Sequence, residues 1–294
     1  MTAPVFILAG EPSGDRLAAS LMRAINHAWG RQQWIGVGGP AMTAQGLSGA
    51  HAMDSLTVMG FGAALAAYPR LSRFADQLVD EIMAARPRLV MTVDVKGFSL
   101  RLAARLKRRM AAEGWSAPIV HTVAPTVWAW GRWRRRRVAR AVDGLLCLFP
   151  FEPEYFTPLG VEASFIGHPE AFNPAYDDAV RPALTEAPHV TLLPGSRRSE
   201  IEHMLKPMLI TLYNLRWTHP QVTATIPALP SMRTEIELVM NRMPGSGSAV
   251  TVDCGDTALF DSLARSRAVL AASGTVTLQT ALYGVPGVAC YVTS

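Results

Sequence analysis

Cysteine is scarce in this sequence, and no metal-ligand pattern is present. The 294 residues contain three cysteines (Cys147, Cys254 and Cys290), with no Cys-x-x-Cys pair. An odd number of widely spaced cysteines argues against a disulfide framework and against a thiolate zinc site. The seven histidines form no His-Glu-x-x-His motif. We therefore expect neither a structural metal nor a cofactor.

Long apolar runs are also lacking, although 49% of the residues are hydrophobic and only 17% are charged. This composition excludes a disordered chain. Proline, glycine or charge interrupts every apolar stretch well short of the roughly 20 residues that a spanning helix needs. The apolar run at residues 5–9 ends at Gly10 and Glu11, which is too early for a signal peptide. These features predict a cytoplasmic protein.

Acidic residues are nearly absent from one segment. Residues 101–140 contain eleven Arg or Lys and one acid, Glu113, in a chain of net charge +5. Such a patch suits anionic lipid, phosphate ligands or nucleic acid. The basic run at 132–137 follows Trp128 and Trp130 and leads into an ordinary strand pattern, which favours a folded helix over a nucleic-acid arm.

Strand, turn and helix patterns alternate along the chain. In the first half we expect strands at 4–9, 34–37, 89–93, 119–123 and 144–148, and helices at 16–29, 71–85 and 100–112. In the second half we expect strands at 190–193, 222–226, 268–271 and 287–291, and helices up to 215 and at 276–283. Alternation of this kind predicts an α/β fold with parallel sheets.

The pattern restarts after a segment rich in Pro, Asp and Ala. We therefore expect a Rossmann-like domain at 1–167, a hinge at 168–188 and a second Rossmann-like domain at 189–294, with a cleft between them. In such sheets ligands bind beyond the carboxyl ends of the strands. Every motif considered below follows a predicted strand.

Two motifs in the first half could carry chemistry. Residues 10–15 open a helix, and Gly10, Ser13 and Gly14 would let an anion approach its N-terminus. The alternative is a plain helix start with Ser13 or Asp15 as the cap. Asp94 follows a buried strand, where a general base would stand, but it could also be a loop or capping residue.

Two motifs in the second half suit a diphosphate. The turn Gly195, Ser196 and Arg197 would bring backbone N–H groups and a guanidinium together, with Glu200 as a capping partner. Residues 273–275 (Ser-Gly-Thr) precede another helix and describe a phosphate cradle or an ordinary helix cap.

An apolar segment at 56–71 could be core, an acyl-chain groove or a membrane patch. The expected lipid- or membrane-facing residues of this segment and of the basic run are Met59, Phe61, Leu65, Tyr68, Trp128, Trp130, Arg132 and Arg134.

Together these motifs resemble the lipid-A-disaccharide synthase family. The matching segments are residues 9–15, 36–42, 58–60, 123–130, 149–152, 165–168 and 193–197, with Asp94, Phe98 and Glu200, and residues 272–275. They occur in the family's order and span nearly the whole chain. Residues 128–130 (Trp-Ala-Trp) and the Gly-Ser-Arg turn, in this order, are the specific part of the pattern.

The resemblance implies an inverting, metal-independent glycosyltransferase of GT-B architecture. It would transfer 2,3-diacylglucosamine from UDP-2,3-diacylglucosamine to 2,3-diacylglucosamine 1-phosphate (lipid X), giving the β-1,6-linked disaccharide 1-phosphate and UDP. The enzyme would act at the cytoplasmic face of the inner membrane, attached to anionic lipid. Asp94 would be the base, with Glu11 or Asp15 as second choices, and Arg197 with residues 196 and 273–275 would bind the diphosphate.

The sequence departs from the family pattern at several points. Gly97 stands where the family has a second carboxylate, Gln279 where it has a glutamate expected at the ribose, and Ala63 where it has an acid. The family also continues past the position of Ser294 with a sugar-nucleotide loop and helices. A degenerate or truncated relative that binds without turnover is therefore an alternative. Another UDP-sugar enzyme, such as a polyprenyl-acceptor transferase or a 2-epimerase, is a further one, and a homo-oligomer is possible in each case.

Overall fold

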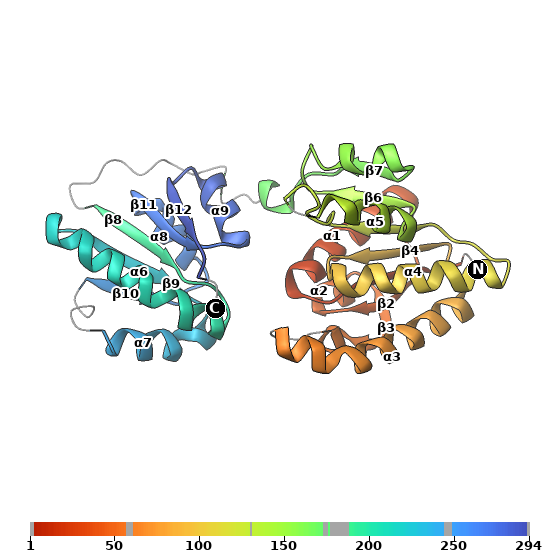
Figure 1. The fold of residues 1–294 in the computed structure, drawn as a ribbon, viewed down its shortest axis with the longest axis horizontal. Helices are drawn as coiled ribbons and strands as arrows, with labels where there is room; N and C mark the ends of the chain where they lie inside the picture. Colours follow the sequence, from red (N-terminus) through yellow and green to blue (C-terminus); the bar gives the residue numbers. More distant parts are fainter. Residues whose placement is uncertain are drawn as a thin grey trace. The chain divides into compact units, whose positions relative to one another are not determined.

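The chain forms two compact units, Met1–His168 and Pro169–Ser294. The structure, a computed structural model, describes residues 3–56, 61–129, 131–172, 176, 188–243 and 249–292, without the side chains of residues 50, 54 and 61–67. Figure 1 shows a sheet with flanking helices in each unit, and each unit is described here by itself.

The first unit is built on a seven-stranded parallel sheet of order β3-β2-β1-β4-β5-β6-β7. Sequence order reverses between β1 and β4, so the topological switch point lies there. The strands are β1 (Val5–Ala9), β2 (Trp34–Gly38), β3 (Leu47–Ala52), β4 (Leu89–Val93), β5 (Ile119–Thr122), β6 (Gly144–Cys147) and β7 (Glu162–Phe165). The helices are α1 (Pro12–Trp29), α2 (Pro40–Ala44), α3 (Phe61–Ala85), α4 (Lys96–Ala112) and α5 (Arg135–Ala141).

The central strands β1 and β4 are buried on both faces, which explains why they read as continuous apolar runs. Successive side chains of β1 alternate between two hydrophobic clusters. Phe6 and Leu8 join a cluster with residues of α3, α4 and α5, whereas Val5, Ile7 and Ala9 join one with residues of α1 and α2. The period of two therefore fixes β1 at the centre of a three-layer unit.

The second unit repeats this plan with a five-stranded parallel sheet of order β10-β9-β8-β11-β12. Its switch point lies between β8 and β11. The strands are β8 (His189–Leu193), β9 (Thr223–Pro227), β10 (Val250–Asp253), β11 (Ala268–Ala272) and β12 (Gly287–Cys290). The helices are α6 (Arg198–Thr218), α7 (Arg233–Asn241), α8 (Ala258–Arg265) and α9 (Thr275–Tyr283).

Successive side chains of the strands again point to opposite faces of the sheet. In β8, Val190 and Leu192 pack with residues of α6 and α7, while Leu193 packs with residues of α8 and α9. The predicted α/β class with two Rossmann-like sheets is confirmed by these two topologies.

Some predicted elements differ in extent. The helix predicted at 71–85 begins at Phe61 and contains Pro69, and the helix predicted at 100–112 begins at Lys96. The predicted hinge contains a short 3-10 helix, η5 (Pro169–Phe172), and most of its remaining residues lie outside the described part of the chain. Within the described ranges, no helix is both long and apolar enough to cross a bilayer.

Candidate functional site

The switch point of the first unit brings the N-terminus of α1 next to Asp94. β1 and β4 pair in parallel up to Ala9 and Val93, so Gly10 and Asp94 leave neighbouring strands at the same edge. A methyl group added to Gly14 would lie 3.9 Å from the Asp94 Cβ, and one added to Gly10 would lie 2.8 Å from Val95 Cγ2. A side chain at position 10 would therefore collide with the side chains of Val95 and Leu56.

Asp94 itself lies in an unusual backbone conformation. Its φ angle is 53° and that of Val95 is 43°, both in the left-handed region that non-glycine residues rarely adopt. The Asp94 N–H donates to the Thr122 carbonyl (3.0 Å), and the Ser99 hydroxyl donates to the Asp94 carbonyl (2.8 Å). The backbone is thus held on both sides, and strain of this kind collects at functional sites.

The Asp94 carboxylate is half-buried and bonds to no other described residue. Val95 is the N-cap of α4, and no side chain caps that helix, so the alternative of Asp94 as a helix cap is not what the structure has. A carboxylate with open oxygen atoms at a strand end can accept a proton from a bound hydroxyl group.

The two other acidic candidates, Glu11 and Asp15, differ in burial and in hydrogen bonding. Glu11 is the exposed N-cap residue of α1, and its side chain makes no capping bond. Asp15 is buried, and its carboxylate accepts the N–H groups of Gly39 (2.9 Å), Ala41 (2.9 Å) and Met42 (3.1 Å). Neither Ser13 nor Asp15 caps α1, because Asp15 instead joins α1 to the start of α2.

In the turn after β8, backbone N–H groups donate to the carboxylate of Glu200. Glu200 Oε2 accepts the N–H groups of Ser196 (3.0 Å) and Arg197 (3.3 Å), and the Arg197 guanidinium lies 3.3 Å from Glu200 Oε1. Gly195 has a φ angle of +117°, and a side chain there would collide with Glu200. The donors that the turn leaves for an anion are the exposed Arg197 side chain and the first-turn N–H groups of α6.

The turn after β11 is the neighbouring feature of the same edge. Ser273, Gly274 and Thr275 are exposed, and α9 begins at Thr275 without a side-chain cap. The Ser273 N–H donates to Cys290 in β12, and the Thr277 hydroxyl donates to the Gly274 carbonyl (2.6 Å). Gln279 lies one helical turn beyond Thr275 and donates to Glu170 Oε2 (3.1 Å). Two helix N-termini, α6 and α9, therefore flank this switch point.

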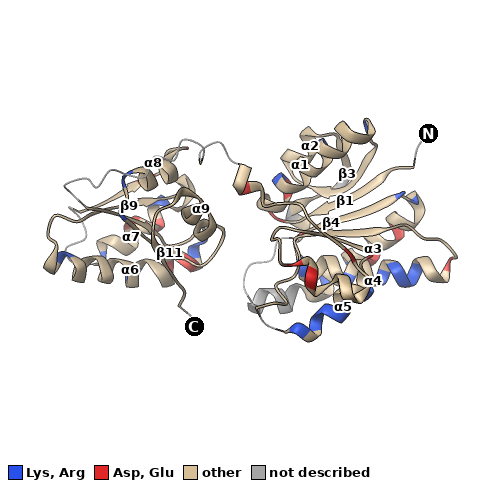
Figure 2. Ribbon diagram, turned by 90° about the horizontal axis from the view of Figure 1, so that it is seen from above, with Lys and Arg blue, Asp and Glu red and all other residues tan. Residues whose placement is uncertain are grey.

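The basic segment folds as the sequence predicted. Arg132 opens a 3-10 turn, η2 (Arg132–Arg134), that runs into α5, and Figure 2 shows basic residues along α4 and α5. Trp128 is exposed and packs edge-on against Phe151, and Arg132 lies over the Tyr155 ring.

Of the other predicted lipid-facing residues, the structure describes the side chains of Tyr68 and Arg134. Tyr68 is exposed and lies under the Arg101 guanidinium, at 5.2 Å. Arg134 lies at the end of η2. Met59 and Trp130 lie outside the described residues, as do the side chains of Phe61 and Leu65.

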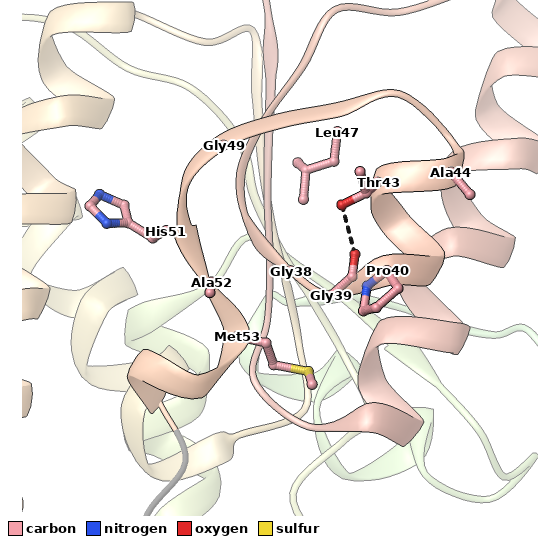
Figure 3. Close-up of a pocket in the computed structure, with 10 residues that line it drawn as sticks. All are labelled: Gly38, Gly39, Pro40, Thr43, Ala44, Leu47, Gly49, His51, Ala52 and Met53. Atoms are coloured by element: carbon pink, nitrogen blue, oxygen red, sulfur yellow. Dashed lines mark hydrogen bonds between the residues drawn. The ribbon is translucent and has the colours of Figure 1, made fainter.

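Sequence reasoning missed a cavity of about 900 Å³ at the carboxyl ends of β2 and β3. Small and apolar residues line most of it, and Thr43 and His51 supply polar groups (Figure 3). His51 pairs with Glu81 at 2.9 Å. Gly39, which accepts the Thr43 hydroxyl, also donates its N–H to Asp15, so the cavity adjoins the start of α2. No charged motif marks this cavity in the sequence.

Each sheet also buries one histidine. Burial lowers the pKa of His121 to about 3, with a contribution from Lys96, and lowers that of His189 to about 4, with a contribution from Arg265. Both side chains are therefore neutral near pH 7. They bond to strand threonines, His121 to Thr92 and His189 to Thr223, each at 2.8 Å.

Among the described residues, no group of three or more His, Cys, Asp or Glu side chains could hold a metal ion.

The sequence matches the family description lipid-A-disaccharide synthetase over residues 5–294. Two similar relatives are lipid-A-disaccharide synthases of Rhodospirillum centenum and Ruegeria pomeroyi. Each is 38% identical and aligns with 98% of this chain, covering 72% and 73% of its own length, respectively.

Solved structures with the same fold include UDP-N-acetylglucosamine 2-epimerases. The enzyme of Neisseria meningitidis, bound to UDP-GlcNAc, has a TM-score of 0.62 at 10% identity over 100% of this chain and 84% of its own. A putative 2-epimerase of Listeria monocytogenes has a TM-score of 0.61 at 14% identity, over 100% of this chain and 80% of its own. At such identity the likeness shows the fold alone.

Proposed function

Because the chain belongs to the lipid-A-disaccharide synthase family and is a glycosyltransferase of lipid A biosynthesis, we propose a division of its reaction between the two units. The first unit binds the lipid acceptor and supplies the base. The second unit binds the UDP part of the donor, UDP-2,3-diacylglucosamine. The reaction joins the donor sugar to lipid X and releases UDP.

The open, half-buried carboxylate of Asp94 carries this proposal. An inverting transfer needs a base that takes the proton of the acceptor hydroxyl as that oxygen attacks the anomeric carbon. The Asp94 carboxylate bonds to no other described residue, and its backbone is held by Thr122 and Ser99. Glu11 is the second candidate. Asp15 is better suited to positioning, because three N–H groups occupy its oxygen atoms.

The leaving group is a diphosphate that gains negative charge as the glycosidic bond breaks. Arg197 and the first-turn N–H groups of α6 and α9 supply cationic and N–H donors for it at one sheet edge. Ser196 helps to shape the turn through its bond to Glu200, and Ser273 and Thr275 place hydroxyl groups at the start of α9. We expect these donors to stabilise the leaving group without a metal ion.

The lipid acceptor would use the apolar cavity beside α2 and the exposed aromatic residues of the first unit. Trp128 and Tyr68 with the arginines of α4 and α5 combine apolar and cationic groups, which suits anionic lipid at the cytoplasmic face of a bilayer. Nucleic acid is not needed to explain this basic surface.

A transfer assay tests the proposal. The protein is incubated with UDP-2,3-diacylglucosamine and lipid X in detergent micelles containing EDTA, and UDP and disaccharide are followed together. Equal amounts of both products are expected, with UDP release dependent on lipid X. Undetectable disaccharide, with UDP binding still measurable by calorimetry, would instead support a relative that binds without turnover.

A further inference from the structure

Three polar side chains meet beside α9 within the second unit. Gln279 Nε2 donates to Glu170 Oε2 at 3.1 Å, and the Tyr176 hydroxyl donates to the same oxygen at 3.0 Å. Glu170 comes from η5, so residues 109 positions apart in the chain are joined here. The contact therefore connects η5, at the start of the second unit, directly to α9, which begins at the switch point of the same unit.

The aromatic neighbours hold this group in place. The Tyr176 ring lies 5.7 Å from the Phe260 ring at an interplanar angle of 76°, and Phe260 also packs near Tyr283. Burial and the bond to Glu170 raise the pKa of Tyr176 well above its usual range. The phenol therefore stays protonated and remains a donor to the carboxylate.

The carboxylate determines which way the Gln279 amide faces. An ionised carboxylate only accepts hydrogen bonds, so it selects the NH2 end of the amide and repels the oxygen end. The amide oxygen of Gln279 then lies on the other side, where it bonds to no other described residue. Without Glu170, either end of the amide could turn in that direction.

The position of Gln279 indicates what its oxygen would meet. Gln279 lies four residues after Thr275, so the two share one face of α9 about 6 Å apart along the helix axis. A diphosphate at the α9 N-terminus would place the attached ribose along that face. In Rossmann-like folds a ribose hydroxyl donates to a side-chain oxygen at the carboxyl edge of the sheet.

We propose that Glu170 is a positioning residue that orients the Gln279 amide so that its oxygen accepts a ribose hydroxyl group. This inference rests on the proposed nucleotide site of the second unit. It predicts that Glu170 affects the binding of the ribose hydroxyls of the UDP-sugar and leaves the binding of the diphosphate unchanged.

Calorimetric titrations of the full chain with UDP and with 2′,3′-dideoxyuridine diphosphate test the inference. Wild-type protein is expected to prefer UDP by about tenfold, because the dideoxy compound lacks the donor for Gln279. Glu170→Ala should reduce this preference to about twofold while leaving the affinity for the dideoxy compound unchanged. Glu237→Ala, which removes an exposed carboxylate paired with Arg233 on α7, should keep the preference.

A second substitution separates orientation from folding. In the double variant Glu170→Ala with Gln279→Glu, the new carboxylate accepts hydrogen bonds in either orientation, so the preference for UDP should return. Retention of the full preference in Glu170→Ala, or no recovery in the double variant, would overturn the inference. Equal loss of both affinities in Glu170→Ala would also overturn it, as a folding effect. No binding of UDP by the wild type would overturn the nucleotide site itself.

Discussion

The switch points of the two sheets share one backbone plan and carry opposite chemistry. The switch point of the first unit lies between β1 and β4, and that of the second unit lies between β8 and β11. The carboxyl ends of these strands form the edge at which the candidate residues stand. The first edge presents the carboxylates of Glu11 and Asp94. The second presents Arg197 and the small polar residues 273–275, and its nearest acid, Glu200, is turned back onto its own turn.

This comparison shows how one architecture can present two different sets of side chains, to which the proposed function gives two different roles. The parallel strands bring the residues that follow them to one edge, and the side chains at those positions then decide the chemistry. Asp94 bonds to no other described residue at the first edge, where the proposed reaction needs a proton acceptor. Glu200 is bonded at the second edge, so its charge is partly offset where a diphosphate would otherwise be repelled.

Removing the base should have the largest effect. Asp94→Asn keeps the shape of the side chain but lowers its basicity, so kcat should fall by about 10²- to 10⁴-fold. Glu11→Gln, at the same edge, should lower kcat by about tenfold or less. Steady-state kinetics of disaccharide formation measure both. A larger loss in Glu11→Gln than in Asp94→Asn would transfer the role of base to Glu11.

The corresponding change at the second edge concerns binding. Arg197→Ala should raise the KM for the UDP-sugar by about 10- to 100-fold, because a charge-assisted contact to phosphate is lost. Arg233→Ala removes another exposed arginine, on α7, and serves as the control. An unchanged KM in Arg197→Ala would remove this residue from the phosphate site.

Asp15 should matter for stability. Asp15→Asn replaces one acceptor oxygen by an NH2 group that faces backbone donors, so the first unit should lose about 2 kcal/mol of its free energy of unfolding. Urea denaturation measures this loss. Glu11→Gln should stay within about 0.5 kcal/mol of the wild type, because Glu11 is exposed. Equal stability of the two variants would show that the contacts between Asp15 and α2 contribute little.

The two buried histidines predict a similar response to acid in both units. Their pKa values are about 3 for His121 and about 4 for His189, below the roughly 6.5 of an unfolded histidine. The unfolded chain therefore binds more protons below pH 6.5, and stability falls as the pH decreases from there toward the folded pKa values. Each histidine should contribute about 1.4 kcal/mol per pH unit.

Urea denaturation of His121→Gln between pH 7 and pH 5 tests this expectation. The variant should lose stability less steeply with decreasing pH than the wild type does. The same slope in both proteins would contradict the assignment to His121.

The smallest effect is expected at the apolar cavity of the first unit. Ala52→Trp places a large ring at its wall, so the KM for lipid X should rise by about threefold while UDP affinity stays the same. Kinetics at varied lipid X concentration measure the change. A lower KM, or an equal one, would place the acceptor elsewhere.

The strand-and-helix plan was predictable because buried parallel strands have continuous apolar runs. β4 was predicted at residues 89–93, as the structure has it. β3 was missed because Leu47–Ala52 contains glycine and alanine in place of branched residues, and α2 because it has only five residues. The elements α7, α8, β7 and β10 were also missed.

The candidate site was only partly predictable. The residues that follow strands could be located, because strand ends are visible in the sequence. Hydrogen-bond partners could not, because they depend on contacts between distant segments: Asp15 with α2, and Glu170 with Gln279. The division into residues 1–167, 168–188 and 189–294, with a separate role for each domain, stays a prediction.

UDP titration of Asp94→Asn and Arg197→Ala, side by side with the wild type, tests the division of roles most directly. The account predicts that Asp94→Asn binds UDP with the wild-type Kd although it has lost turnover, and that Arg197→Ala binds UDP about 10- to 100-fold more weakly. Equal weakening in both variants, or weakening in Asp94→Asn alone, would contradict it.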